Sequence, residues 1–420
     1  MTWLSPKEAV HEDPDYLYTS VPSTDRKPAW AVFSVFLGFI VVAGQMTVGG
    51  GLASQLSKGD LIAAVLIGNA IAGVFAAFAG YTGVTSGKSF VILTKEAFPQ
   101  GTWRVACLYV PLVLIGWYAV EAAIFGSLLA SAAGAGSIAT RLFIVGSAIL
   151  FASSTFIGFK GLRYVSYVAV PVMIGIGTYA IVRVMTSTNA DFGFGSVQLS
   201  LGQATALVVG SWIMGALTCV PDLTRFNRSH WAAIAIGFFG ILLGNSFNHL
   251  VGAAGAAFAK QADPAVILMT LGLVVPGLVF ALANIWTTND GNMYSASLNA
   301  APVLGISRRA AVVLCTGLAA GLAMFRPHEM PKLFMFLGVL NVTAPALGAV
   351  VLGGYWLRRR GLIGDSDNPA PAWLGWIGGS GVAYITGAEW AFLTGFVVAG
   401  IIFWGATLLT QTSRRPALEL

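Results

Sequence analysis

The residues with the clearest chemical meaning are aromatic and polar side chains inside long apolar segments. In the segment near 105–132, Trp117 and Glu121 stand four positions apart, so a helix places both on one face. A carboxylate at mid-bilayer costs about 2.5–3.5 kcal/mol on insertion scales, so it usually faces a cavity or a partner. The pair predicts an indole on which a planar solute stacks and an acceptor for ring N–H groups. A protonated Glu121 bonded to a neighbouring helix is the alternative.

A second polar group lies on one face of a later segment. Asn284, Thr287 and Thr288 have the i, i+3, i+4 spacing of helical neighbours. One carbonyl and two hydroxyl groups can give oxygen ligands to a hard cation, and carbonyl groups of an unwound first segment would complete the shell. Hydrogen bonding between helices accounts for such residues equally well. The spacing therefore predicts either a cation site or an interhelical contact.

Glycine and polar residues also interrupt two other apolar segments. The first segment contains Gly38 and Gln45 and continues into three glycines at 49–51, and the sixth contains Ser211 and Trp212 between glycines. Interrupted segments at matching places in two halves mark the central site of many secondary transporters. The two segments are five apart, as a five-plus-five inverted repeat requires. We therefore predict that helices 1 and 6 are discontinuous.

The elements that would position these residues are membrane spans. The chain has 420 residues, 56% hydrophobic and only 10% charged, whereas soluble domains carry about 25% charged residues. Apolar runs of about 18 residues or more can cross the bilayer as helices. We predict an all-α polytopic membrane protein with about 12 transmembrane helices, near 30–53, 60–84, 105–132, 141–158, 163–186, 204–221, 231–258, 265–288, 309–325, 332–357, 372–388 and 390–411.

The loops between these segments indicate an orientation. With twelve spans and both termini cytoplasmic, 17 of the 23 Lys and Arg residues fall on the inner side, as the positive-inside rule requires. We therefore expect a multi-pass protein of the inner, cytoplasmic membrane, in contact with the lipid bilayer. The basic residues are spread from loop to loop, whereas a nucleic-acid surface gathers them on one face, so no nucleic-acid partner is expected.

The chain divides into five parts on this interpretation. Residues 1–28 are expected to be a disordered cytoplasmic tail, 29–186 the first inverted repeat and 187–357 the second. Residues 358–412 would form two additional spans, and 413–420 a cytoplasmic C-terminal tail. We expect the protein to be a monomer.

Other classes of protein fit the sequence less well. The three cysteines form no CxxC pair and the four histidines are scattered, so no metal site, organic cofactor or enzymatic activity is expected. A channel would show repeated pore-lining rings, and none is visible. A non-transporting membrane binding protein stays open, although no soluble domain is attached that could relay a signal.

Five sequence stretches resemble the nucleobase–cation symporter family, and most closely its cytosine-permease branch. The resemblance is collinear over about residues 30–360, with NIWTTND and the ALVVGS run as its most specific parts. The stretches are DLIAAVLIGNAIAG (60–73), GWYAV (116–120), ALVVGSWI (206–213), GNSFNHLVGAAGAA (244–257) and NIWTTND (284–290).

The resemblance implies ten core helices in two inverted repeats, with the substrate between helices 1, 3, 6 and 8. The base would stack between Trp117 and Trp212. Its other contacts would come from a set of polar, small and flexible residues around these rings: Glu121, Ser211, Met214, Asn284, Asn289, Gly38 and Gln45.

The resemblance also implies Na⁺ as the coupling ion, held between helices 1 and 8. Its ligands would be the main-chain carbonyls of Gly38, Val41 and Asn284 and the hydroxyls of Thr287 and Thr288. H⁺ is the alternative coupling ion, with Glu121 or Asp290 as its carrier.

Two positions depart from the family pattern. Glu121 and Met214 stand where cytosine permeases have small residues. We therefore expect a secondary active importer of a planar heterocycle, cytosine or a purine, driven by Na⁺ through alternating access. An H⁺-coupled symporter of the same fold for a hydroxymethylpyrimidine, a hydantoin or an allantoin-type solute is the alternative.

Overall fold

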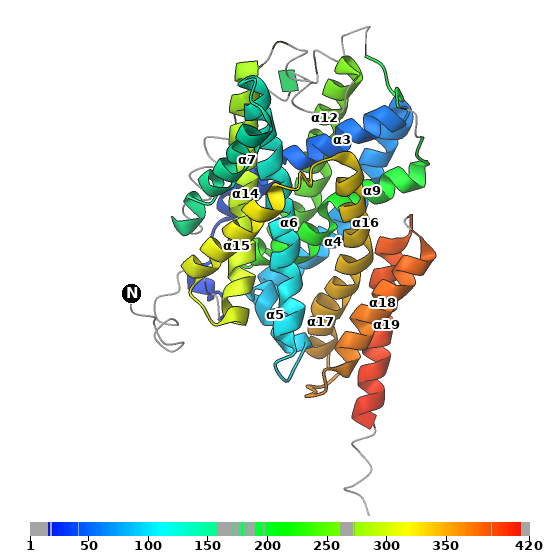
Figure 1. Cartoon of the computed structure of the whole chain (residues 1–420). Helices are drawn as coiled ribbons and strands as arrows, with labels where there is room; N and C mark the ends of the chain where they lie inside the picture. The colour runs from blue at the N-terminus through cyan, green and yellow to red at the C-terminus, as the bar shows by residue number, and fades with distance from the viewer. Residues whose placement is uncertain are drawn as a thin grey trace, which may run out of the picture.

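The computed structural model describes most of the chain. It covers residues 16, 19–40, 42–157, 190–195, 198–260, 272, 274–387 and 389–412, with single residues at 171, 175, 178, 179 and 182. Over these residues the chain is mainly helical, and most of the long helices follow one long axis of the molecule (Figure 1).

Most helices of the first half follow the predicted segments, but a short helix over 90–97 lies between two of them. They are α2 (Ala29–Ile40), α3 (Ala43–Gln55), α4 (Lys58–Ser86), α5 (Phe90–Ala97), α6 (Trp103–Ala132) and α7 (Ser137–Phe151), with short 3-10 turns η1 (Ser23–Asp25) and η2 (Ser154–Ile157). The predicted fifth span, 163–186, lies outside the described residues apart from the single residues named above.

The second half contains longer helices with π-helical insertions. They are α9 (Leu201–Met214), η3 (Gly215–Cys219), α10 (Val220–Thr224), α11 (His230–Phe239), η4 (Gly240–Asn245), α12 (Ser246–Ala259), α14 (Val274–Leu304), α15 (Arg308–Ala323), α16 (Met330–Gly348), η5 (Ala349–Gly353), α17 (Gly354–Arg359), α18 (Ala370–Thr386) and α19 (Ala391–Thr412).

The described helices are long and apolar enough for a multi-pass membrane protein. Six of them could each cross a bilayer, or up to eight if each bent pair counts as one span. The predicted eighth span ends too early, because α14 begins at Val274 and continues to Leu304. Its second half is rich in buried polar side chains, which lowers the hydropathy of the sequence without ending the helix. The number twelve stays a prediction.

Helix 1 is broken as predicted. Ile40 ends α2, Ala43 begins α3, and the two parts are bent by 50° relative to each other. Val42 between them has the extended φ and ψ of −127° and 124°. Two buried segments therefore meet near the middle of the molecule, where the backbone groups at the break need partners outside the helix.

The prediction that helix 6 is discontinuous is wrong. Residues 201–224 form one continuous span in which five residues, Gly215–Cys219, adopt a π-helix. Gly215 keeps helical angles, φ −59° and ψ −41°. A Cβ atom on it would lie 2.6 Å from the ring of Trp212. The glycine therefore makes room for an indole, and the helix widens at this place where a break was expected.

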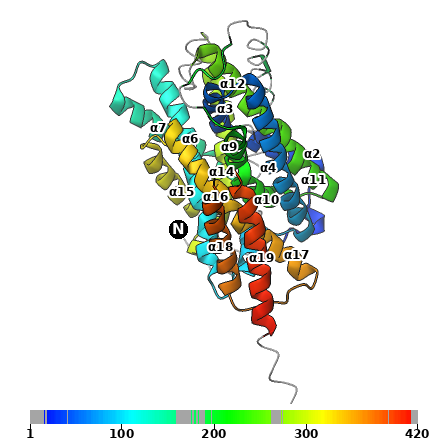
Figure 2. The same ribbon diagram turned by 90° about the vertical axis from the view of Figure 1, so that its right-hand side faces the viewer.

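The helices pack in two groups, with a hairpin outside them. In the first group α4 lies against α9 and α11, and α3 lies against α12; in the second, α6 lies against α7, α14 and α15. Fewer contacts join α2 and α3 of the first group to α14 and α6 of the second. The helices α18 and α19 lie side by side (Figure 2) and pack mainly on α16, and Phe396 of α19 also contacts Phe75 and Phe78 of α4.

The prediction of a disordered tail over residues 1–28 is wrong for residues 19–28, which we call the N-terminal strap. The Val21 N–H donates to the carbonyl of Gly87 at 2.8 Å, and Val21 is only 2% exposed. The Arg26 guanidinium donates to the carbonyl of Val84 at 2.8 Å. The strap is thereby fixed to the C-terminal end of α4.

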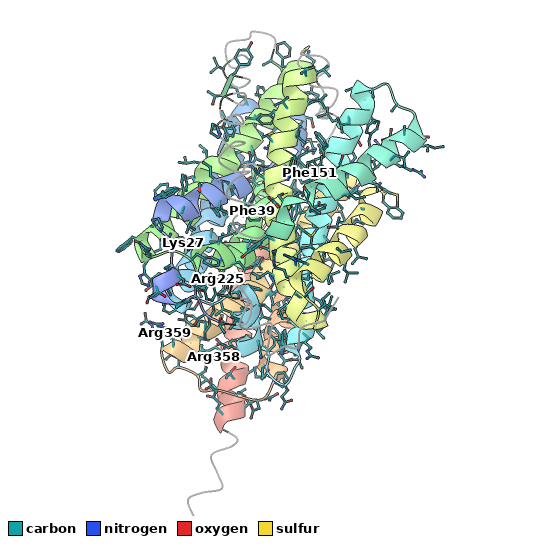
Figure 3. All side chains as sticks on the ribbon, turned by 90° about the vertical axis from the view of Figure 1, so that its left-hand side faces the viewer. Lys27, Phe39, Phe151, Arg225, Arg358 and Arg359 are labelled. Atoms are coloured by element: carbon teal, nitrogen blue, oxygen red, sulfur yellow. The ribbon has the colours of Figure 1, made fainter. Side chains whose placement is uncertain are left out.

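The strap is also joined to the segment after α10. Lys27 and Asn227 form a parallel β-bridge, and the Arg228 N–H donates to the carbonyl of Lys27 at 3.1 Å. Arg225, which is fully buried, donates to the carbonyl of Tyr16 at 2.9 Å. Lys27 and Arg225 lie close together in Figure 3, below Phe39. The strap therefore connects the ends of two helices of the first group.

Candidate functional site

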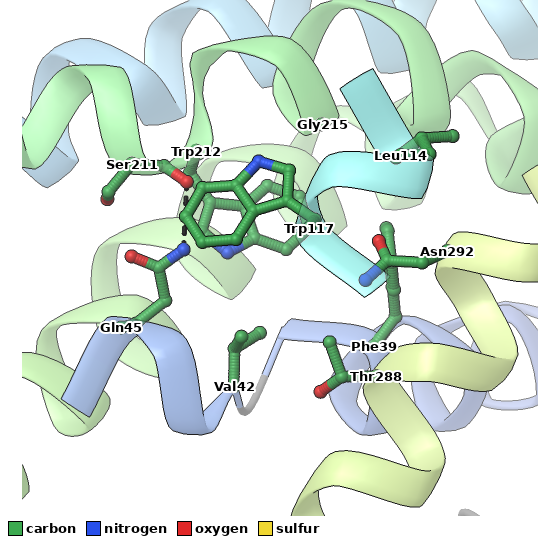
Figure 4. A pocket seen from close by; sticks show the side chains of 10 residues that line it. All are labelled: Phe39, Val42, Gln45, Leu114, Trp117, Ser211, Trp212, Gly215, Thr288 and Asn292. Atoms are coloured by element: carbon green, nitrogen blue, oxygen red, sulfur yellow. Dashed lines mark hydrogen bonds between the residues drawn. The ribbon is translucent and has the colours of Figure 1, made fainter. Parts of the chain in front are cut away.

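A small cavity lies at the break in helix 1, between the two groups of helices (Figure 4). Its volume is about 30 Å³, and the side chains around it are buried. It is lined by Phe39, Val42, Gln45, Leu114, Trp117, Ser211, Trp212, Gly215, Thr288 and Asn292. Space of this size holds about two water molecules, so a planar ring enters only after helices or side chains move.

One side of the cavity is aromatic. Trp117 of α6 and Trp212 of α9 both line it, at 7% and 5% exposure, and their indoles overlap in the view of Figure 4. Phe39 packs edge-on against Trp212 with ring centroids 5.1 Å apart, and Phe336 packs edge-on against Trp117 at 5.4 Å. These contacts hold each indole in place, and such edge-on pairs are favourable beyond the area they bury.

The other side is polar. The side-chain amide of Gln45 donates to the main-chain carbonyl of Ser211 at 2.8 Å, which joins α3 to α9 beside the indole of Trp212. The Gln45 Oε1 has no hydrogen-bond partner among the described residues. Thr288 and Asn292, one turn apart on α14, line the cavity from the second group. Polar groups, one of them a buried unpaired acceptor, therefore stand beside the indoles.

Side chains from other helices bind the backbone groups at the break in helix 1. Asn248 of α12 donates to the carbonyl of Ile40, the last residue of α2, at 2.7 Å. The N–H of Gly44, in the first turn of α3, donates to Oε1 of Glu121 at 2.6 Å. Unwound backbone inside a membrane protein requires such partners, because an unsatisfied group there costs several kcal/mol.

Glu121 lies directly behind the cavity. A Cβ atom on Gly44 would lie 2.6 Å from Glu121 Oε1 and 3.2 Å from the Trp117 ring. Trp117 and Glu121 therefore face the same point of helix 1, as their spacing predicts. Glu121 does not line the cavity, it is fully buried, and its second oxygen has no partner among the described residues. In this conformation it contacts helix 1, which was the alternative that the sequence left open.

The polar face of α14 lies on the helix-1 side of the second group. The hydroxyls of Thr287 and Thr288 donate to the main-chain carbonyl of Asn284, at 2.8 and 3.1 Å. The side-chain oxygen and nitrogen of Asn284 are buried and have no partner among the described residues. The main-chain carbonyl that we expected as a cation ligand therefore already accepts two hydrogen bonds. The Oδ1 atom of the same residue has no such partner.

The structure places three further predicted residues, Gly38, Met214 and Asn289, near this centre without bringing them to the cavity. Met214 and Asn289 are buried but do not line it. Thr218 donates to the Met214 sulfur at 3.0 Å, and Asn289 donates to the carbonyl of Tyr118 at 3.4 Å. Gly38 is buried in α2, and Val41 lies outside the described residues. The binding roles of these residues stay predictions.

Reasoning from the sequence missed the role of Asn248 and five residues that line the cavity: Phe39, Val42, Leu114, Gly215 and Asn292. Phe39 lies one position after Gly38 and was hidden in an apolar run, and Asn292 lies one turn after Thr288. Extending the i, i+4 pattern of Asn284 and Thr288 by one turn leads to Asn292. The role of Asn248 has no local signal in the sequence, because its partner at Ile40 is 208 residues away.

The fold and the cavity define the class of protein. Several apolar helices, a span broken at its middle, and a small buried cavity between two groups of helices are the architecture of a multi-pass membrane transporter. In the described residues no group of three or more His, Cys, Asp or Glu side chains could hold a metal ion.

Comparisons with known proteins identify the family. Residues 20–370 match the family described as permeases for cytosine/purines, uracil, thiamine and allantoin, and the chain belongs to this family. It is 31% identical to the cytosine permease of Escherichia coli K12 over 359 residues, which cover 84% of this chain and 83% of the permease. It is 22% identical to the hydantoin permease of Microbacterium maritypicum over 434 residues, 96% of this chain and 86% of that protein.

Solved structures share the fold. Mhp1, a nucleobase-cation-symport-1 family transporter, in a closed conformation with bromovinylhydantoin bound, superposes with a TM-score of 0.82 at 16% identity over 96% of both chains. Its inward-facing conformation gives 0.78 at 15% identity, covering 98% of this chain and 95% of that one. A Na⁺-coupled sialic acid symporter gives 0.66 at 11% identity, covering 94% and 92%.

Proposed function

We propose that this chain is a secondary active importer of a nucleobase or a nucleobase-like planar heterocycle. The observation that carries the proposal is the cavity beside the broken helix 1, where Trp117 and Trp212 stand next to the polar groups of Gln45 and Thr288. Two indoles favour a flat ring, and stacking contributes about 0.5–1.5 kcal/mol per aromatic pair. The family and the relationship to the cytosine permease support this class of solute.

Selectivity among rings would come from hydrogen bonds. A buried polar group left unpaired costs about 1–3 kcal/mol, so the unpaired Oε1 of Gln45 favours a ring that presents an N–H to it. Gly44 lies between Glu121 and the ring of Trp117. If helix 1 moves at Gly44 when the cavity opens, the carboxyl group of Glu121 would come within reach of a solute stacked on Trp117. A ring with two N–H groups, such as a purine or a hydantoin, would use both acceptors.

Na⁺ is the coupling ion in this proposal. The hydroxyls of Thr287 and Thr288 donate to the carbonyl of Asn284, and a hydroxyl that donates its hydrogen can also coordinate a cation through its oxygen. The unpaired Oδ1 of Asn284 adds a further oxygen on the same helix. Na⁺ bound between α14 and the break in helix 1 would hold the two groups of helices together. Solute and ion would then strengthen each other's binding reciprocally.

Thermal-shift measurements on the detergent-purified chain test the solute and the ion together. The panel contains cytosine, uracil, adenine, hypoxanthine, hydantoin and allantoin, each in sodium chloride and in choline chloride. We expect stabilisation by at least one of these rings, and a larger shift with sodium. Uptake of that ring into proteoliposomes should then follow an inward sodium gradient. Failure of every ring to bind would refute the proposal, and binding without accumulation would indicate a non-transporting binding protein.

Coupling to protons is a second candidate, favoured by one observation. Glu121 is a fully buried carboxyl group with one unpaired oxygen, placed between the Trp117 face of the cavity and helix 1. Uptake that ignores sodium and follows a pH gradient would support it. Glu121→Gln should then lose accumulation and retain exchange, whereas the sodium mechanism predicts that accumulation by this variant still follows sodium.

We further propose that the chain lies in the inner membrane with both termini in the cytoplasm. The distribution of Lys and Arg over the predicted loops supports this orientation. Proteolysis of right-side-out and inside-out vesicles that carry a C-terminal tag tests it. The tag should be cut only in the inside-out preparation.

A further inference from the structure

Asp222 is a buried carboxylate at the end of helix 6 that joins the two groups of helices. It belongs to α10, which packs against α4 and α2 of the first group, and it is fully buried. The N–H of Phe90, the first residue of α5, donates to its Oδ1 at 2.7 Å. The side-chain amide of Asn299 on α14 donates to its Oδ2 at 3.4 Å. Since α5 packs against α6 and α14, both bonds cross from one group to the other.

The strap contacts near Asp222 are of a different kind. They connect the end of α4 with the segment after α10, and both belong to the first group. Arg225 donates to the main-chain carbonyl of Asp222 at 3.0 Å, within the same helix. These contacts can persist while the two groups separate. The side-chain carboxylate of Asp222 cannot keep its partners under the same movement.

A polar line on α14 connects the cavity with Asp222. Thr288, Asn292, Ser295 and Asn299 follow one another at intervals of four, three and four residues, so they lie on one face of the helix. None of them is more than 5% exposed. Thr288 and Asn292 line the cavity, and Asn299 binds Asp222. Buried polar residues inside spans often mark the route of a solute or an ion.

We propose that Asp222 is the positioning residue that holds the inner end of this route shut. Its bonds to Phe90 and Asn299 are made in the present conformation and break when the cavity opens toward the cytoplasm. A carboxylate suits this role, because hydrogen bonds to an ionised acceptor at a helix N-terminus are strong yet reversible. The inference rests on the transport function and the orientation proposed above.

Cys219 provides a natural reporter of this opening. It precedes Asp222 by three residues, it is fully buried, and Ser295 of α14 lies beside its sulfur. The other cysteines, Cys107 and Cys315, are also buried. A membrane-impermeant maleimide applied to inside-out vesicles should therefore modify Cys219 only when the inner end opens. Mass spectrometry of the peptides distinguishes the three positions.

The experiment compares the labelling rate of Cys219 in the wild type and in variants. Asp222→Ala should raise the labelling rate about tenfold. The charge-assisted hydrogen bonds that favour the closed conformation are then lost, and the open conformation is populated more often. Asp222→Asn keeps one oxygen for the Phe90 N–H and should label at an intermediate rate. The control is Glu96→Gln, which breaks an exposed ion pair with Lys88 beside the same short helix, and it should label like the wild type.

Asn299→Ala covers the case in which the Asp222 variants fail to fold. It removes the α14 partner, leaves the Phe90 contact intact, and should raise labelling by a smaller factor. Unchanged labelling of folded Asp222→Ala and Asn299→Ala would overturn the inference. The thermal shift of the wild type with nucleobases is measured separately. Failure of the substrate proposal is therefore seen there, and failure of the Asp222 proposal is seen in the labelling.

Discussion

The two sides of the cavity differ in what they can recognise. The aromatic side, Trp117 and Trp212, is held by edge-on phenylalanine contacts at 5.4 and 5.1 Å. The polar side contains Gln45, whose amide is bound to Ser211 while its oxygen is unpaired, together with Thr288 on α14. An aromatic face attracts every flat ring to a similar degree, whereas a fixed donor or acceptor distinguishes one ring from another.

This difference teaches how affinity and selectivity are divided in the site. Stacking of about 0.5–1.5 kcal/mol per pair changes little between cytosine and adenine. An unmatched buried polar group costs about 1–3 kcal/mol, which depends on the pattern of donors and acceptors. Variants of the aromatic side should therefore weaken all rings alike, and variants of the polar side should reorder them. Variants of Trp117, Gln45 and Trp212 are therefore compared over a panel of planar heterocycles.

The largest effect is expected for Trp117→Ala. It removes a buried indole that lines the cavity and packs on Phe336. Loss of stacking worth about 0.5–1.5 kcal/mol per aromatic pair, together with loss of this wall of the cavity, should lower uptake of every ring about tenfold or more. The matched control is Trp231→Ala, which removes an indole that is 81% exposed. Normal uptake by Trp117→Ala would disprove the stacking model.

Thr288→Ala should act mainly on the cation. Loss of the hydroxyl should raise the sodium concentration for half-maximal uptake about tenfold, in line with about 1.4 kcal/mol for one lost polar contact. Thr288→Ser keeps the hydroxyl and should stay within about twofold of the wild type. Uptake is measured against sodium at a saturating ring concentration. An equal effect of both variants would indicate a packing role for the threonine methyl group.

Gln45→Ala should change the order of preference among rings. Loss of its acceptor costs about 1 kcal/mol, or about fivefold, for rings that donate an N–H to it, and rings without that donor should lose less. The readout is the dissociation constant of each ring. Gln411→Ala, which alters an exposed contact with Gly364, serves as the control. A uniform loss of affinity for all rings would show that Gln45, like the aromatic side, contributes to affinity and not to selectivity.

Trp212→Phe should have the smallest effect. The smaller ring retains a flat face beside Phe39 and loses part of the stacking area. Because only a fraction of the stacking energy is lost, every ring should bind about threefold more weakly. The measurement is again the dissociation constant across the panel. A change in the order of preference would show that the indole N–H takes part in recognition.

Much of the fold could be predicted from the sequence because apolar length and glycine placement are local signals. The break in helix 1 between Ile40 and Ala43 follows from glycines and polar residues in an apolar run. The same signal failed for helix 6. There Gly215 accommodates the ring of Trp212, and a sequence does not distinguish a glycine needed for packing from one needed for a break.

The pairing of distant residues could not be predicted. The spacing of Trp117 and Glu121 correctly places both on one face, but it does not give the N–H of Gly44 as the partner of the carboxyl group. The same applies to Asp222, whose partners Phe90 and Asn299 come from two other helices. Tertiary packing decides such contacts, and single-sequence patterns contain no information on it.

The N-terminal strap has a consequence for the synthesis of the chain. The guanidinium of Arg228 donates to the main-chain carbonyl of Arg26, and the two residues are 202 positions apart. At about 5–20 residues per second, the ribosome needs about 10–40 s to make that length. The partners of the strap at Val84 and Gly87 are made early. Throughout this interval, however, its partners at Asn227 and Arg228 are missing, so the strap is only partly docked and more open to proteases and chaperones. Its protection from digestion therefore reports that the sixth span has been inserted and assembled.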